Sequence, residues 1–392
     1  MQGELVAIKI MNESAFRSDE MLGGFRRGVR SMRMVGDSQI DGLVPLIEAY
    51  ELPPTIVMPF VEGVSLQEAF ERRSDLSWET KIRISSRVAE IVSRAHALPS
   101  TILHRDLKPS NIMIENFEYQ GDFDPVVKVL DFDMSWHKGS KEKDVIFESR
   151  DDFGFLSPEQ TGASPRYHAQ TTKVDSYGFG MTIYFMFGGV APLANEPLNP
   201  TWARSVRRAV SRDYRYDWIS APTKLARIVV KATSFDQAER VDFFRLRNQL
   251  NLIEKSIVDP LNVSDSDFWG EELLARIGAS VDYVWDDEGS CGHVSSPSGI
   301  TVSVISNFRD QSIDLKIEYS DSGAMERSGR ATILRQRLDM ALRELKDAGW
   351  QKGVGNVLMG GLVINATISV GDLSLSSPSV STLSKLYRKF LA

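Results

Sequence analysis

The sequence predicts an α+β protein made of two domains, and three observations support this fold class. The 392 residues suffice for two or three domains at roughly 150 residues each. The first 258 residues read as a few short strands followed mainly by helices, whereas residues 259–392 mix strands with amphipathic helices. Apolar residues make up 42% and charged residues 25% of the chain, which is typical of globular domains and excludes a disordered or collagen-like chain.

The first domain is expected to begin with strands and a single helix and to continue mainly with helices. In chain order they are a strand at 5–11, a helix at 13–35, strands at 43–49 and 55–61, and helices at 65–72 and 78–98. A hairpin-like pair follows at 112–115 and 126–130, because polar residues and Gly121 separate two apolar runs. An irregular segment over 131–157 then precedes helical periodicity from 172 to about 256.

The second domain is expected to follow the polar stretch 261–267, which reads as a linker or a helix entry. Strict alternation of apolar and polar residues over 313–319 predicts a strand with one buried face. Residues 331–347 place their leucines on one stripe that ends at Gly349, which predicts an amphipathic helix. The remaining expected elements are a strand at 357–370, a serine-rich loop at 374–384 and a terminal helix at 382–391.

Charge and cysteine content narrow the classes of function. The 46 Lys+Arg residues against 53 Asp+Glu give a net charge of -7, which disfavours a nucleic-acid coat or a polybasic membrane binder. The lone Cys291 cannot form an intrachain disulfide or a zinc cage, and it fits a reducing compartment. We therefore expect a cytoplasmic protein with no nucleic-acid partner.

Two segments bear on membrane insertion. Residues 1–10 lack the basic start and the long apolar stretch of a signal peptide. Residues 180–194 are apolar, but this 15-residue segment contains a Gly-Gly pair and a proline, whereas a membrane span needs about 20 apolar residues. We expect a buried core helix there and no membrane span.

Five polar side chains of the first domain carry the candidate chemistry. Asp106, Lys108 and Asn111 lie in the run HRDLKPSN, Asp131 opens the run DFD, and Lys9 ends the run VAIK. Such a set suits phosphoryl transfer, which needs neutralised phosphates, a magnesium ligand set and a positioned hydroxyl. Asp106 can accept the proton of that hydroxyl, and Lys108 can balance charge on the transferred group. Asn111 and Asp131 offer the hard oxygen ligands that Mg²⁺ prefers.

These motifs resemble the eukaryotic-like Ser/Thr protein kinases of the bacterial type, over about residues 3–256. VAIK, HRDLKPSN and DFD are each weak alone, but together in this order they are very specific. The resemblance implies a two-lobed protein-kinase fold, with an N-lobe at 1–62 and a C-lobe at 63–258. The pattern of residues 259–392 predicts a small α+β accessory domain. The resemblance also implies ATP and Mg²⁺ as cofactors, and transfer of phosphate to Ser or Thr hydroxyls of a protein substrate.

The resemblance assigns further structural roles. The run SPE at 157–159 matches the end of the activation segment, and Glu159 is expected to pair with Arg240. Asp175, in DSYGFG, is expected to accept hydrogen bonds from the backbone of the catalytic loop, which is the run HRDLKPSN at 104–111. Arg105 would bind an anion on the activation segment. The candidate serines for such an anion are Ser135, Ser140 and Ser149.

The resemblance also places the adenine site. Met58 would be the gatekeeper residue, and the Pro59 carbonyl would accept a hydrogen bond from the adenine amino group, because proline keeps its carbonyl. Val61 would donate its backbone N–H. Ala7 and Met113 would sandwich the ring, although without the neighbouring motifs both would be interpreted as simple core residues.

Two departures from the family pattern concern ATP binding. Met1 lies only eight residues before Lys9, which leaves no room for a Gly-rich loop and the first two strands of the N-lobe. An incomplete chain or a misplaced start is therefore expected. Gly28 stands in the position of the helix glutamate that pairs with the lysine in these kinases, so Lys9 is expected to contact Asp131 or phosphate instead.

Two further departures concern the activation segment, and alternative functions follow. Asp133 replaces the glycine of the DFG-like motif, and Asp152 occupies the place of a threonine before SPE. The rival hypothesis is a pseudokinase or scaffold that binds partners without turnover. A small-molecule phosphotransferase is disfavoured by Arg105, Lys108 and the SPE run. The domain at 259–392 carries no recognisable chemistry and is expected to recruit a regulatory partner.

Overall fold

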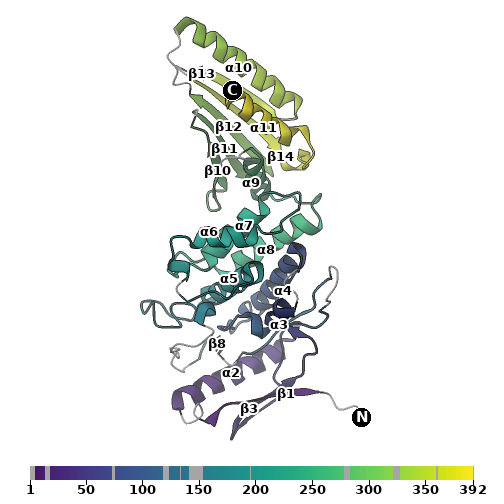
Figure 1. The fold of residues 1–392 in the computed structure, drawn as a ribbon, viewed down its shortest axis with the longest axis vertical. Coiled ribbons are helices and arrows are strands. Elements are labelled where there is room, and N and C mark those ends of the chain that lie inside the picture. Colours follow the sequence, from purple (N-terminus) through teal and green to yellow (C-terminus); the bar gives the residue numbers. More distant parts are fainter. Residues whose placement is uncertain are drawn as a thin grey trace. The chain divides into compact units, whose positions relative to one another are not determined.

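The structure is a computed structural model (Figure 1). It describes residues 5–13, 18–72, 76–117, 123–132, 134–140, 153–194, 196–277, 283–297, 299–320, 327–358 and 361–391. The chain forms two compact units, of which the first comprises Met1–Tyr214 and Pro222–Glu254. The second unit comprises Arg215–Ala221 and Lys255–Ala392. The boundary between Glu254 and Lys255 lies close to the expected domain boundary at residue 258. The sequence pattern does not indicate that Arg215–Ala221 joins the second unit.

The first unit begins with a three-stranded antiparallel sheet in the order β1-β3-β2. Its strands are β1 (Val6–Ile10), β2 (Glu48–Glu51) and β3 (Pro54–Pro59). Ala7 lies opposite Met58 in the pairing of β1 with β3. Strands are therefore present where 5–11 and 55–61 predict them, whereas the strand expected at 43–49 lies further along the chain.

Helix α2 (Asp19–Ser38) packs on this sheet and on β8 (Trp136–His137). Ser18 is the N-cap residue of this helix, and its hydroxyl accepts a hydrogen bond from the backbone N–H of Met21 at 3.4 Å. Helix α2 ends where Gln39 takes the left-handed conformation at φ 51°. The helix buries an apolar face formed by Phe25, Val29, Met32 and Val35.

The rest of the first unit is mainly helical. Its helices are α3 (Leu66–Arg72), α4 (Trp78–His96), α5 (Thr172–Gly188), α6 (Trp202–Val210), α7 (Ala221–Ala232) and α8 (Phe243–Val258), although Ala221 and the end of α8 after Glu254 belong to the second unit. Its short strands are β4 (Val64–Ser65), β5 (Ile102–Leu103), β6 (Ile112–Ile114), β7 (Val127–Val129) and β8. β6 pairs with β7 as the sequence predicts, and β5 pairs with β8.

Helix α5 lies at the centre of the helical part and is buried on almost all sides, which explains its nearly continuous apolar sequence. The buried helix expected within 180–194 is therefore confirmed as far as Gly188, where α5 ends. Gly178 lets α5 approach the catalytic loop, because a Cβ there would lie 3.0 Å from the carbonyl oxygen of Leu107. No helix in the described residues is long and apolar enough to cross a bilayer.

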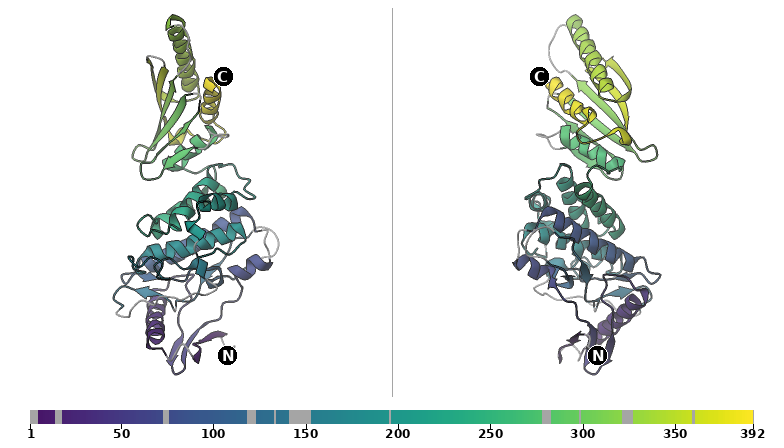
Figure 2. Two further views of the ribbon diagram at one scale, coloured as in Figure 1. Left: turned by 60° about the vertical axis from the view of Figure 1, so that its left-hand side comes forward. Right: turned by 90° about the vertical axis from the view of Figure 1, so that its right-hand side faces the viewer.

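The second unit is a six-stranded antiparallel sheet in the order β13-β14-β12-β11-β10-β9. Its strands are β9 (Val284–Asp286), β10 (Cys291–Ser295), β11 (Ile300–Asn307), β12 (Ser312–Ser320), β13 (Gln351–Leu358) and β14 (Gly361–Ser369). One face carries the helices α9 (Ser266–Ile277), α10 (Arg327–Asp347) and α11 (Pro378–Leu391) (Figure 2). On β12, Ile313, Leu315 and Ile317 are buried against them.

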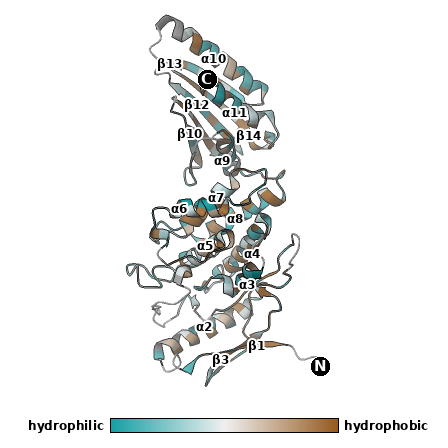
Figure 3. Ribbon diagram, in the orientation of Figure 1, coloured by the Kyte–Doolittle hydropathy of each residue, from teal (hydrophilic) through white to brown (hydrophobic). Residues whose placement is uncertain are grey.

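The elements expected in the second unit are confirmed only in part. The strand expected at 357–370 is present as β14, which forms a hairpin with β13, whereas the sequence pattern does not predict β9, β10, β11 and β13. The terminal helix α11 starts at Pro378, inside the expected serine-rich loop, because proline suits the first turn of a helix. The amphipathic helix expected at 331–347 is confirmed within α10, which carries both apolar and polar residues (Figure 3).

Glu272 on α9 fixes the segment Arg215–Ala221 to the second unit. Its buried carboxylate accepts hydrogen bonds from the backbone N–H groups of Ile219 at 3.2 Å and Ser220 at 2.9 Å, and from Arg276 Nε at 2.7 Å. Trp218 packs beside these groups, with its ring centroid 5.0 Å from that of Phe268 and 4.5 Å from that of Trp269.

A Glu272→Ala protein is expected to lose about 3 kcal/mol of unfolding free energy, because two backbone donors and one guanidinium lose a buried acceptor. Urea unfolding followed by tryptophan fluorescence measures this loss. The matched control is Asp310→Ala, which removes an exposed carboxylate of the same unit. Equal unfolding midpoints for the two variants would contradict the role of Glu272.

Candidate active site

The run HRDLKPSN lies between β5 and β6, and the side chains of Lys108 and Asn111 both contact that of Asp106. Asp106 is only 6% exposed. Lys108 Nζ lies 3.2 Å from Asp106 Oδ2, and Asn111 Nδ2 donates to the same oxygen at 3.0 Å. Asn111 Nδ2 also donates to the Asp106 carbonyl at 2.8 Å. The carboxylate is therefore held by a cation and an amide, in a fixed orientation.

The hairpin of β6 and β7 brings Asn111 and Asp131 to one end. Ile112 pairs with Val129, and the backbone N–H of Leu130 donates to the Asn111 carbonyl at 2.9 Å. Asp131 directly follows Leu130, so it lies at the end of the hairpin where the catalytic loop enters β6.

Lys9 reaches this end of the hairpin from β1. Its Nζ lies 2.6 Å from Asp131 Oδ2. This contact agrees with the expectation from Gly28, which offers no side chain to Lys9. The ion pair is partly solvent-exposed, at 44% for the Lys9 side chain and 25% for that of Asp131, so it adds little to stability and mainly positions the two groups.

Two residues of the site adopt the left-handed backbone region, which side-chain-bearing residues rarely enter. Arg105 has φ 68° and Asp131 has φ 69°. Such conformations cost free energy and persist where the surrounding contacts determine them, often at functional sites. Both residues adjoin the groups that the sequence assigns to catalysis.

Asp175 anchors the catalytic loop as predicted. Its carboxylate accepts hydrogen bonds from the backbone N–H groups of His104 at 2.9 Å and Arg105 at 2.6 Å. His96 Nε2 lies 2.7 Å from Asp175 Oδ2, a contact that the sequence does not indicate because a single histidine near a helix end carries no signal. Burial raises the pKa of Asp175, but the hydrogen bond and charge of His96, together with His104 and the Arg105 N–H, bring it below its ordinary 3.8.

The lowered pKa of Asp175 predicts a pH dependence of stability. A carboxyl group with a lower pKa in the folded state stabilises the protein above its unfolded pKa, and this contribution is lost as pH falls through the folded pKa. The penalty of Asp175→Asn, measured by urea unfolding, is therefore expected to be full at pH 7 and to shrink below about pH 4. The exposed Asp37→Asn serves as control, and a penalty independent of pH would contradict the assignment.

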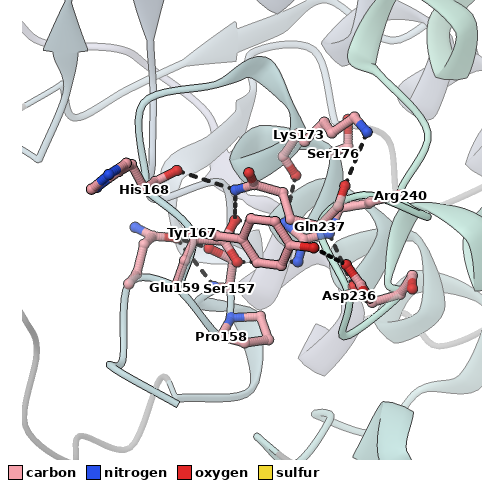
Figure 4. Close-up of polar contacts among 12 residues, drawn as sticks. Ser157, Pro158, Glu159, Tyr167, His168, Lys173, Ser176, Asp236, Gln237 and Arg240 are labelled. Atoms are coloured by element: carbon pink, nitrogen blue, oxygen red, sulfur yellow. Dashed lines mark hydrogen bonds and ion pairs between the residues drawn. The ribbon is translucent and has the colours of Figure 1, made fainter. Parts of the chain in front are cut away.

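The predicted pair of Glu159 and Arg240 is present and fully buried (Figure 4). Arg240 Nη1 lies 2.7 Å from Glu159 Oε1, and Nη2 lies 3.1 Å from Oε2. Gln237 Nε2 donates to Glu159 Oε1 at 2.8 Å, and Arg240 Nη1 donates to the Lys173 carbonyl at 3.0 Å. This network joins the end of the SPE segment to the start of α5 and the loop before α8.

Gln160 links the SPE segment to the catalytic loop and was not predicted. Its Nε2 donates to the Arg105 carbonyl at 2.7 Å. Its Oε1 accepts from the backbone N–H of Ser157 at 3.1 Å and from the Ser157 hydroxyl at 2.9 Å. The only sequence signal was its position directly after SPE.

Arg27 holds α2 against the segment that follows Asp131. Its buried Nε donates to the Ser135 carbonyl at 3.0 Å, and Ser31 Oγ lies 3.0 Å from His137 Nδ1. Burial and the guanidinium groups of Arg30 and Arg27 lower the pKa of His137. Helix α2 is thus tied to this segment without the glutamate that Gly28 replaces.

The residues predicted for adenine binding lie on two sheets. Ala7 and Met58 face each other across β1 and β3, and Pro59 ends β3. The backbone N–H of Val61 has no hydrogen-bond partner in the part of the chain that the structure describes, so it is available as a donor. Met113 lies half-buried on β6, and no strand pairing joins it to Ala7 within the described residues.

Two of the three candidate acceptor serines need correction. Ser135 is fully buried and its hydroxyl donates to the Phe132 carbonyl, so it is inaccessible in this conformation. Ser140 Oγ is also buried. Ser149 lies outside the described residues, as do Asp133 and Asp152.

Comparison with known proteins agrees with this fold, which defines a member of the protein kinase class. The family model for the protein kinase domain matches residues 1–249, and the chain belongs to this family. Its similarity to bacterial serine/threonine kinases places it with the eukaryotic-like type.

Two relatives illustrate the similarity. The chain is 25% identical over 273 residues to the probable serine/threonine-protein kinase PknB of Lactococcus lactis, covering 69% of this chain and 39% of that protein. It is 27% identical over 237 residues to the serine/threonine-protein kinase PrkC of Bacillus subtilis, covering 60% of this chain and 34% of that protein. The matched region is thus at most about two fifths of each relative.

Proposed function

We propose that this chain transfers a phosphoryl group from ATP to Ser or Thr hydroxyls of proteins. The observation that carries the proposal is the contact of Lys108 and Asn111 with the Asp106 carboxylate, at the end of the hairpin where Lys9 meets Asp131. These are the parts that phosphoryl transfer requires: a base for the hydroxyl, cations for the phosphates and oxygen ligands for a metal.

Asp106 would accept the proton of the substrate hydroxyl. Its side chain is oriented by Asn111, and Lys108 at 3.2 Å would neutralise charge that develops on the transferred group. Lys9 would contact phosphate oxygens, while its present partner Asp131 would turn to the metal.

Asn111 and Asp131 fit a magnesium ion. Because Asn111 Nδ2 donates both of its hydrogen bonds to Asp106, Oδ1 is left as an acceptor, and no described residue donates to it. The described residues contain no cluster of three or more His, Cys, Asp or Glu that could hold a metal alone. This suits Mg²⁺, which binds one or two protein ligands together with substrate phosphates.

The adenine ring would lie between Ala7 and Met113, beside Met58, with the Pro59 carbonyl and the Val61 N–H as its hydrogen-bonding partners. The pairing of Ala7 with Met58 and the available N–H of Val61 support this placement. The domain at 259–392 would bind a regulatory partner. The support for this role is the separate compact fold of the domain alone.

The test is incubation with Mg-ATP and, in parallel, a Ser/Thr-rich protein acceptor or an aminoglycoside, with phosphate incorporation measured by mass spectrometry. Phosphoserine or phosphothreonine in the protein acceptor, abolished by EDTA, is the expected result. Phosphate on the aminoglycoside alone would indicate a small-molecule phosphotransferase instead.

A scaffold without turnover is the second candidate, and Gly28 favours it, because glycine places no carboxylate at this position of α2, while Lys9 contacts Asp131. For this candidate, neither acceptor gains phosphate, whereas ATP still protects the chain against thermal unfolding.

A further inference from the structure

A cavity in the first unit lies beside a stripe of arginines, and neither feature takes part in the chemistry proposed above. The cavity has a volume of about 390 Å³ and lies between α3, α4 and the end of α5. Three aromatic rings line it: Phe70, Phe185 and Phe187. Phe70 and Phe187 are almost fully buried, so the cavity has an apolar floor that suits a large apolar side chain.

The charged groups that line the cavity balance one another. Glu71 and Asp213 are the acids, and Lys81 and Arg212 are the bases. Lys81 Nζ lies 5.6 Å from the ring centroid of Phe187, within the range of a cation–π contact. The cavity itself therefore offers no net charge, and an uncharged occupant suits it best.

Two of the three arginines in the stripe have no such balancing acid. Arg204 and Arg208 on α6, and Arg212 just beyond its end, are spaced four residues apart and are all exposed. The opposite face of α6 is buried, with Trp202 and Val206 in the core. Arg204 and Arg208 form no ion pair with any residue that the structure describes, so this part of α6 presents two exposed positive charges on a chain of net charge -7.

Arg212 belongs to both features, because it ends the stripe and lines the cavity. We propose that the stripe and the cavity together, termed the α6 surface, bind an acidic segment of a partner protein that places one aromatic or large aliphatic side chain in the cavity. Guanidinium groups bind carboxylates in a forked geometry, and a buried apolar anchor surrounded by polar contacts is the usual arrangement of a binding hot spot.

The α6 surface does not overlap the catalytic loop. Helix α5 contacts the loop at Asp175 and reaches α6 at Gly188, 13 positions further on, which corresponds to about 20 Å along the helix. A segment bound there leaves the catalytic loop accessible. The inference therefore stands independently of the proposed function, and its test needs no ATP.

The test uses the full chain and a fluorescein-labelled synthetic peptide in which one Phe is flanked on both sides by Glu residues, with binding followed by fluorescence polarisation. We expect saturable binding that weakens with added salt. Arg204→Glu combined with Arg208→Glu should weaken it by about tenfold or more. Ala191→Trp, which fills the cavity from its lining, and replacement of the peptide Phe by Ala should each weaken it as well.

The matched control is Lys385→Glu combined with Arg388→Glu, which introduces the same charge change on exposed positions of α11 and should leave binding unchanged. The proposal is wrong if the parent chain shows no saturable binding up to about 1 mM peptide, or if the Arg204/Arg208 double variant binds as the parent does. Phosphatidylserine vesicles that bind the parent but not this variant, in the absence of peptide binding, would assign the surface to lipid and overturn the proposal too.

Discussion

An Asp106→Asn protein is expected to lose phosphoryl transfer by about 10²- to 10⁴-fold while keeping its fold. The amide is nearly the same size as the carboxylate, so it can still accept hydrogen bonds from Lys108 and Asn111. It cannot, however, take up the proton of a substrate hydroxyl. Initial rates of phosphate incorporation at saturating Mg-ATP measure the loss.

Asp310→Asn is the control for this experiment, because it makes the same chemical change at an exposed position of the second unit. Thermal unfolding of both variants should match that of the parent. An Asp106→Asn protein that transfers phosphate at the parental rate would remove Asp106 from the mechanism and leave the site without a base.

Replacing Arg240 with Ala is expected to lower the unfolding free energy by about 3–5 kcal/mol. The substitution leaves Glu159 buried, with Gln237 as a remaining donor but without a compensating charge. It also removes the guanidinium that lies over the Tyr177 ring, 5.0 Å from its centroid. Urea unfolding of the first unit measures the loss.

Two further variants separate an unpaired charge from lost packing. In the double variant Glu159→Met with Arg240→Met, both charges are absent and the volume is largely kept, so most of the stability should return. Arg166→Ala breaks the exposed pair of Arg166 with Asp236 and should have a small effect. An Arg240→Ala protein as stable as Arg166→Ala would contradict the expected role of the buried pair.

Much of the candidate site could be predicted from the sequence because its groups lie in short runs with fixed spacing. Asp106, Lys108 and Asn111 are close in the chain, so a single loop brings them together. Hairpin pairing then brings Asp131 to the same place. His96 and Gln160 could not be predicted, because their partners lie 79 and 55 residues away and only the tertiary fold creates those contacts.

The fold was less predictable in the second unit for a different physical reason. β10 reads CGHVS and β13 reads QKGVGNVL, so glycines and polar residues interrupt the alternation that marks a half-buried strand. Both strands gain their place from pairing with neighbours that have clear patterns, such as β11 and β14. The start of α11 was missed because a serine-rich run ordinarily indicates a loop.

The segment Arg215–Ala221 has a consequence for how such proteins can be cut and recombined. The chain leaves the first unit before Arg215, returns at Pro222 and leaves again after Glu254. The polypeptide therefore passes between the two units three times instead of once. A protease cut or a gene fusion at residue 258 would separate Trp218 from Phe268 and Trp269, exposing a wholly buried indole. Residues 259–392 alone therefore do not make up the whole second unit, and a fusion of this unit to another kinase would also have to include Arg215–Ala221.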